Sequence, residues 1–290
     1  MSTFAITGIS GNVGGAAARK LLAGPARVRA VVRNEAVAAS WRDRGAEAVV
    51  ATHDDAVALA HAFEGVDGVF VMTPTWFASE DMYAENEKAV SAIGRALRAA
   101  RTRKVVLLSS IGAQRAQGTG AIMKLHAMER AFSDLPGVTS VRAGWFMENF
   151  AGLIPHVRAT GELPSMLAPL DRAIPMVATQ DIGDLVADLL QQEWSGQRIV
   201  ELEGPRRYSP QDVAATFATV LDRAVQARAL EPGQWHATFR SWGLTDRSAA
   251  AMSEMLAAFN TGWIDYEQPA TQTLHGATTL DAVLSRLSSN

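Results

Sequence analysis

The fold of this 290-residue chain is decided by its opening stretch, Phe4-Ala5-Ile6-Thr7-Gly8-Ile9-Ser10-Gly11-Asn12-Val13-Gly14-Gly15-Ala16-Ala17-Ala18-Arg19-Lys20-Leu21-Leu22. An apolar run that can form a buried strand meets glycines three residues apart, followed by small and apolar residues at helical spacing. Gly8 permits a tight exit from the strand, Gly11 leaves room for a pyrophosphate, and Gly14 allows close packing of helix on strand. The stretch predicts a strand, a phosphate loop and a helix.

The helix expected to begin near Asn12 would aim free N–H groups and the positive end of its dipole at a phosphate. Glycine triplets also occur in ordinary turns. Here the triplet lies between a strand pattern and a helix pattern, which is the context that a dinucleotide site requires. We therefore expect a bound dinucleotide at the start of the chain.

Four more strand patterns alternate with helical patterns, at residues 28–32, 48–51, 68–72 and 104–108. The near-continuous apolar run at 68–72 is typical of a central parallel strand. This alternation predicts an α/β fold with a doubly wound parallel Rossmann sheet and right-handed crossovers. The ligand crevice should lie at the carboxyl ends of the first and fourth strands.

Composition restricts the partners. The formal net charge is −3 and no block of lysine or arginine is present, so we expect no nucleic acid and no membrane as partner. The chain has no cysteine, and its six histidines show no metal-ligand spacing, so we predict no metal site. No apolar run approaches the roughly 18 to 20 residues of a membrane span. We expect a cytoplasmic monomer or homodimer acting on a small molecule.

The second strand pattern ends at Arg33. An NAD site usually places an acidic residue there for the ribose 2′-hydroxyl, whereas an NADP site places a cation for the 2′-phosphate. The sequence therefore favours NADP(H) over NAD(H). Two alternatives stay open: Arg33 is simply solvated, or Glu35 serves a ribose hydroxyl.

Two further strand ends face the same crevice. Asp54 follows the third strand, where it either contacts the adenine or caps the next helix. Thr73 and Pro74 follow the fourth strand and should lie beside the cofactor, with Trp76 next to them as a candidate substrate contact.

The second half is less explicit. Residues 138–141 should form a sixth strand, after which Trp145 and Phe146 provide an apolar floor and Asn149 a hydrogen-bonding group for cofactor or substrate; core packing explains the aromatics equally well. Residues 151–175 suit a loop or lid over the cleft. Asp181 is the expected N-cap of a helix, and residues 198–202 a further strand. The methionine- and tryptophan-rich segment 235–259 is either a pocket wall or, more simply, core.

Together these features resemble the NmrA-like branch of the atypical short-chain dehydrogenases/reductases. The resemblance rests on Thr7-Gly8-x-x-Gly11-x-x-Gly14, Val32-Arg33-Asn34, Asp54, Ser109-Ser110, the run from Arg142 to Phe150, and Gly276-x-x-Thr279-Leu280. It implies an NADPH-binding Rossmann domain, placed at residues 1–150. It also implies a smaller C-terminal part, placed at 151–290 and expected to be mostly helical, which closes the cleft; residues 173–202 should return to the sheet.

Carried over residue by residue, the resemblance and the strand-end positions give one set of expected cofactor contacts: Gly8, Ser10, Gly11, Asn12, Val13, Gly14, Arg33, Asp54, Thr73, Pro74, Ser109 and Lys124. The expected substrate contacts are Trp76, Trp145, Phe146 and Asn149.

Lys124 is the expected catalytic residue. The wider superfamily places a tyrosine four residues before such a lysine, one helical turn away, so that the lysine lowers the pKa of the phenol. Here Gly120 occupies the tyrosine position, and Lys124 is left to bond the nicotinamide ribose and to supply charge or a proton. The alternatives are a solvated lysine, a lysine paired with Glu129, and His126 as the acid.

The resemblance implies hydride transfer from NADPH to a quinone or a similar aromatic or conjugated acceptor, which needs no strong general acid. The alternative is a non-catalytic NADP(H)-binding redox sensor acting through a protein partner. Sugar-nucleotide epimerase chemistry is weaker, because it requires the missing tyrosine. Sequence motifs of triad hydrolases, zinc proteases and P-loop enzymes are absent.

Overall fold

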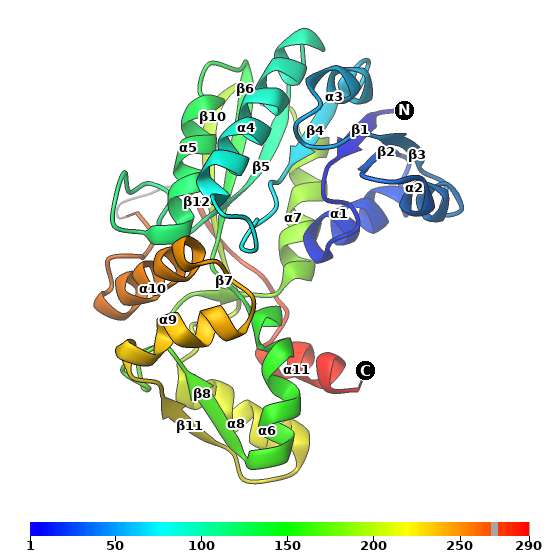
Figure 1. Ribbon diagram of the computed structural model, residues 1–290. Coiled ribbons are helices and arrows are strands. Elements are labelled where there is room, and N and C mark those ends of the chain that lie inside the picture. Colours follow the sequence, from blue (N-terminus) through cyan, green and yellow to red (C-terminus); the bar gives the residue numbers. More distant parts are fainter. Residues whose placement is uncertain (268–271, 290) are drawn as a thin grey trace.

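The computed structural model describes residues 1–267 and 272–289, and within them a parallel sheet of eight strands dominates the fold (Figure 1). In spatial order the strands are β12 (Gln272–His275), β10 (Gly196–Glu203), β6 (Gly137–Ala143), β5 (Val105–Ser110), β4 (Gly68–Val71), β1 (Thr3–Ile6), β2 (Arg27–Val32) and β3 (Glu47–Val50). All neighbours pair in parallel. The prediction of a doubly wound Rossmann sheet is confirmed.

Helices cover both faces of the sheet. One face carries α1 (Asn12–Leu22), α2 (Glu35–Arg42) and α7 (Thr179–Gln191), and Figure 1 shows α1 and α7 side by side. The other face carries α3 (Ala56–Phe63), α4 (Met82–Ala99) and α5 (Met123–Ala131). Side chains of β1 alternate between the two cores: Phe4 and Ile6 pack towards α1, and Ala5 packs towards α3 and α4.

β1 has β2 on one side and β4 on the other. From β1 the chain first adds strands on one side of the sheet, β2 and β3, and then on the other, beginning with β4. Ligands of open α/β sheets bind at such a switch point, outside the carboxyl ends of the strands. Thr7 joins the strands at this point, because its hydroxyl donates to the carbonyl of Phe70 at 3.1 Å and accepts from the N–H of Met72 at 3.0 Å. The expected crevice is therefore built around the phosphate loop.

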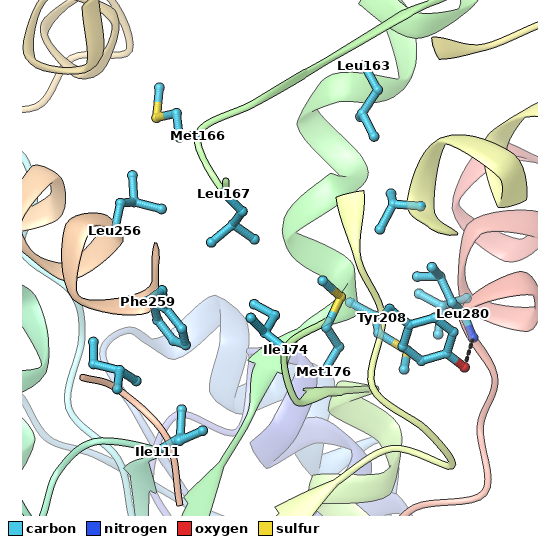
Figure 2. Packing of buried hydrophobic residues seen from close by; sticks show 14 of the residues in the cluster. Ile111, Leu163, Met166, Leu167, Ile174, Met176, Tyr208, Leu256, Phe259 and Leu280 are labelled. Atoms are coloured by element: carbon cyan, nitrogen blue, oxygen red, sulfur yellow. Dashed lines mark hydrogen bonds between the residues drawn. The ribbon is translucent and has the colours of Figure 1, made fainter. Parts of the chain in front are cut away.

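Most of the remaining elements form the part drawn below the sheet in Figure 1. The remaining elements are a 3₁₀ turn before α5 (Gly120–Ile122), β7 (Trp145–Phe146), a 3₁₀ segment (Met147–Leu153), α6 (Ile154–Thr160), β8 (Glu162–Ser165), β9 (Met176–Val177), α8 (Pro210–Leu221), β11 (Gln226–Ala229), α9 (Pro232–Ser241), α10 (Asp246–Thr261) and α11 (Leu280–Ser288). Their own apolar core includes Leu163, Ile174 and Phe259 (Figure 2). Within it the Tyr208 hydroxyl accepts the N–H of Leu280 at 3.3 Å.

Two predictions for the second half are wrong. Residues 151–175 are not a plain loop, because they contain part of the 3₁₀ segment, α6 and β8. Asp181 is not an N-cap: α7 begins at Thr179 after Ala178, and the Asp181 carboxylate accepts hydrogen bonds from the backbone and hydroxyl of Thr278 instead. It thus ties α7 to the segment before α11. The division of the chain at residue 150 stays a proposal.

Candidate active site

The phosphate loop borders a small recess of about 30 Å³ at the carboxyl ends of β1, β2 and β3. Its lining comprises Thr7, Gly8, Ser10, Val31, Val32, Arg33, Ala51, His53 and Leu59. Burial, followed by the charge of Arg33, lowers the pKa of His53, so this imidazole is neutral at physiological pH. The recess combines apolar walls with an exposed guanidinium at its mouth, as an adenosine 2′-phosphate requires.

A second, open groove of about 470 Å³ continues from the loop between α1 and α2. Ser10 borders both hollows, while Gly11 and Asn12 line only the groove. Val13 and Gly14 are buried behind them, where helix packs on strand. A β-carbon at Gly14 would lie 2.5 Å from the carbonyl oxygen of Gly8, so this close approach requires glycine.

The segment after β4 connects the loop to Lys124. The Thr73 hydroxyl donates to the side-chain oxygen of Asn86 at 2.9 Å, and the Asn86 amide donates to the Lys124 carbonyl at 3.1 Å. The Lys124 ammonium in turn donates to the Pro74 carbonyl at 3.0 Å. The structure thus brings Thr73, Pro74 and Lys124 together, and their contacts with a cofactor stay a prediction.

Lys124 is 7% exposed although it is a lysine. Its Nζ lies 5.9 Å from the centre of the Trp76 ring and 5.8 Å from that of Phe77. Desolvation lowers the pKa of this amine to about 8, because burial disfavours the charged form. At neutral pH Lys124 is therefore mostly protonated but gives up its proton far more readily than a solvated lysine.

The position four residues before Lys124 is closed by backbone. Gly120 has φ +51, and a β-carbon there would lie 2.0 Å from the carbonyl oxygen of Ala251 in α10. Met82, Ala121 and Ala251 form a buried apolar cluster at this contact. Trp76, Phe77, Tyr83, Met252 and Met255 pack around that cluster. The lysine thus faces an aromatic and methionine-rich environment without a neighbouring phenol on its own helix.

The alternative partners of Lys124 are engaged elsewhere. Glu129 binds Arg142 at 2.8 Å and accepts the Ser109 hydroxyl at 2.5 Å, so it does not pair with the lysine. The His126 Nδ1 lies 2.8 Å from the Ala113 carbonyl. The Ser109 side chain points into the ion-pair network, and its expected contact with a cofactor remains a prediction.

The other predicted residues are more scattered. Asp54 is exposed and is not a helix cap; its neighbour Asp55 caps α3 by accepting from the N–H groups of Val57 and Ala58. Trp145 and Phe146 form β7, paired with β9, and the Trp145 ring contacts Phe259 edge-on at 5.6 Å. Asn149 is exposed in the 3₁₀ segment. Trp145 thus packs on the core of the lower part.

Sequence reasoning missed His53 and Asn86. His53 directly precedes Asp54 at a strand end, so its position was a usable signal. Asn86 lies within α4 and is 2% exposed. Its signal in the sequence was a polar residue on the apolar face of a predicted helix.

The model of the NmrA-like family matches residues 1–279. The chain belongs to the NmrA-like family. A curated relative of this NmrA-like chain is the NAD(P)H azoreductase of Xenophilus azovorans, 23% identical over 253 residues, which are 87% of this chain and 85% of the relative.

Solved structures share the fold of this NmrA-like protein. The NADPH-dependent quinone oxidoreductase of Escherichia coli, complexed with NADPH, superimposes with a TM-score of 0.81 at 23% identity, covering 98% of this chain and 99% of that one. The Citrobacter triphenylmethane reductase complexed with NADP(H) gives 0.82 at 18% identity, covering 99% and 100%.

Among the described residues, no helix of this NmrA-like chain has the length and apolar character to cross a membrane. The same ranges contain no cluster of three or more His, Asp or Glu side chains placed to hold a metal ion.

Proposed function

We propose that this protein is an NADPH-dependent oxidoreductase that transfers hydride to a quinone or a similar aromatic or conjugated acceptor. One observation carries the proposal: a buried lysine with a lowered pKa lies at the carboxyl edge of a Rossmann sheet, against aromatic rings. Its relatives include a reductase of azo compounds, and its structural neighbours reductases of quinones and triphenylmethane dyes. Azo compounds, quinones and triphenylmethane dyes are all conjugated.

The residues around the loop suit a phosphorylated dinucleotide. The backbone N–H groups at the start of α1 bind the pyrophosphate, and the recess under Arg33 takes the adenosine with its 2′-phosphate. No carboxylate follows β2 directly, and Glu35 is paired with Arg42. This arrangement favours NADP(H) over NAD(H).

Bound NADPH supplies the hydride. The chain orients it: Lys124, anchored by Pro74, bonds the nicotinamide ribose and holds a proton next to the acceptor. Quinones and dyes are electrophilic enough to accept hydride before protonation is complete. A lysine whose pKa is near 8 then provides the positive charge and proton that the reduced acceptor needs.

The test is a steady-state assay of NADPH oxidation against quinones, azo and triphenylmethane dyes, and enones, with NADH as the comparison cofactor. We expect turnover with at least one acceptor class and a preference for NADPH. Binding of NADPH without turnover of any acceptor class would contradict the catalytic proposal, and a preference for NADH would contradict the role of Arg33.

A further inference from the structure

Trp76 has an unusual backbone. Its φ is +50, in the left-handed region that bulky side chains rarely adopt. Among the described residues, the other non-glycine positions with positive φ are Arg101 and Asp222, both polar and without a site nearby. Strained residues of this kind persist only where the surrounding structure imposes them, and they gather at ligand clamps.

The structure holds this conformation from both sides. Before Trp76, the Pro74 carbonyl accepts the Lys124 ammonium at 3.0 Å. After it, the Phe77 carbonyl accepts the N–H of Thr245, at the start of α10, at 3.2 Å. A turn bond from the Ser79 N–H to the Trp76 carbonyl at 2.9 Å completes the segment. α5 and α10 thus fix the backbone that directs the indole.

The indole contacts residues on two sides. Its ring meets His53 edge-on, with centroids 6.4 Å apart, and His53 lines the recess under Arg33. The centre of the same ring lies 5.9 Å from the Lys124 ammonium. A dinucleotide that extends from the recess to Lys124 must therefore pass this ring.

The floor of that path is adaptable. The Met72 thioether lies against Gly8, where a β-carbon would be 2.3 Å from the sulfur. Methionine is flexible and polarisable, so it can move aside or pack under a ligand at little cost. The Trp76 indole is therefore held in place by its backbone, whereas the Met72 side chain is free to adjust its conformation.

We propose that Trp76 is a cofactor clamp: its indole packs over the dinucleotide between the adenosine and nicotinamide ends, with Met72 beneath. This inference rests on the proposed function and moves Trp76 from the substrate side, where the sequence placed it, to the cofactor side. The hydrogen bond from the Lys124 ammonium to the Pro74 carbonyl then connects Lys124, at the nicotinamide end, to the segment that carries Trp76.

The experiment measures binding of NADP⁺, which cannot react, by calorimetry and tryptophan fluorescence in the full-length protein. Trp76→Gly removes the ring, and glycine adopts the positive φ without strain. Trp76→Phe keeps an aromatic ring at the same place. Trp242→Phe is the matched control, because Trp242 is 57% exposed and packs on Phe239, away from the crevice.

We expect Trp76→Gly to weaken NADP⁺ binding about tenfold, because the bound dinucleotide loses its contact with the large indole surface, and 2′,5′-ADP binding clearly less, because that ligand lacks the nicotinamide half. Trp76→Phe should bind within about threefold of wild type but show a smaller fluorescence change. Trp242→Phe should show the wild-type change.

Unchanged NADP⁺ affinity in Trp76→Gly, equal losses for NADP⁺ and 2′,5′-ADP, or a full-size fluorescence change in Trp76→Phe would each overturn the clamp. These outcomes leave the proposed reductase activity intact. By contrast, failure of the wild-type protein to bind NADP⁺ or NADPH would remove the proposed function itself.

Discussion

The α-carbon of Gly120 lies against the carbonyl of Ala251, so close that a β-carbon on residue 120 would be 2.0 Å from that oxygen. Gly120 lies four residues before Lys124, in the 3₁₀ turn (Gly120–Ile122) that leads into α5. The backbone of α10 occupies the space beside it, so the structure as it stands has no room for a side chain at this position.

Replacing Gly120 should be costly. Gly120→Ala adds both left-handed strain and a clash with backbone, and we expect a loss of about 3 kcal/mol in the free energy of unfolding. Gly243→Ala is the control: its φ is +87, but nothing lies within 4 Å of the new β-carbon. It should lose only about 1 kcal/mol from strain. Urea unfolding measures both, and equal losses would show that α10 does not close the position.

The pKa of Lys124, about 8, predicts the pH dependence of the reaction. If the ammonium assists the reduction, kcat/KM should be constant below pH 8 and fall as pH rises through it, because the amine becomes neutral. Lys124→Met should lower kcat/KM by about 10² to 10³ at pH 7. Lys124→Arg keeps a charge that does not titrate, so a decline near pH 8 that survives in this variant would assign the decline to another group.

Burial of Lys124 also affects stability. Its pKa is lowered on folding, so the unfolded chain binds more protons between about pH 8 and 10.5, and stability rises with pH in that window. Below pH 8 both states are charged, and the full desolvation cost opposes folding. Lys124→Met should thus raise the free energy of unfolding by about 1–2 kcal/mol at pH 7, less than the full cost because the bond to Pro74 is lost.

Urea unfolding of Lys124→Met and wild type between pH 6.5 and 9.5 checks this. The advantage of the methionine variant should shrink above pH 8. An advantage that grows with pH would mean that the lysine is not desolvated in the folded protein.

Arg33 should determine the preference between the two cofactors. Arg33→Ala removes the guanidinium at the mouth of the recess, and we expect KM for NADPH to rise about 10- to 100-fold, as for loss of a charge-assisted bond to phosphate. KM for NADH should change little. Arg27→Ala is the control. Arg27 is also exposed, but it lies at the opposite end of β2 from Arg33. Equal effects of Arg33→Ala on both cofactors would refute the assignment.

A buried ion pair links α5 to the sheet. The Arg142 side chain is 5% exposed and binds Glu129, 13% exposed, at 2.8 Å. Arg142→Leu leaves the carboxylate without its partner and should reduce the free energy of unfolding by about 3–5 kcal/mol. Adding Glu129→Leu should recover part of the loss. If the double variant were less stable than Arg142→Leu alone, the loss of stability in Arg142→Leu would come from packing and not from an unpaired charge.

The fold was largely predictable because its signals are local. The apolar strands at residues 28–32 and 68–72 and the helices between them appear at nearly the predicted positions, since alternating buried strands and helices of one-sided polarity leave a periodic pattern. Capping is local too: the Ser209–Asp212 capping box starts α8. The prediction of Asp181 as a cap was wrong because its carboxylate accepts a hydrogen bond from the hydroxyl of Thr278, which is distant in the sequence.

The sequence by itself determined a Rossmann sheet with a glycine-rich loop after β1 and an arginine after β2. Only the tertiary structure decided that Lys124 is buried and bound to Pro74, that Glu129 binds Arg142, and that the Trp76 ring contacts His53. The physical reason is that dehydration, partner choice and a strained φ depend on which segments meet after folding, and residues that far apart leave no periodic pattern along the chain.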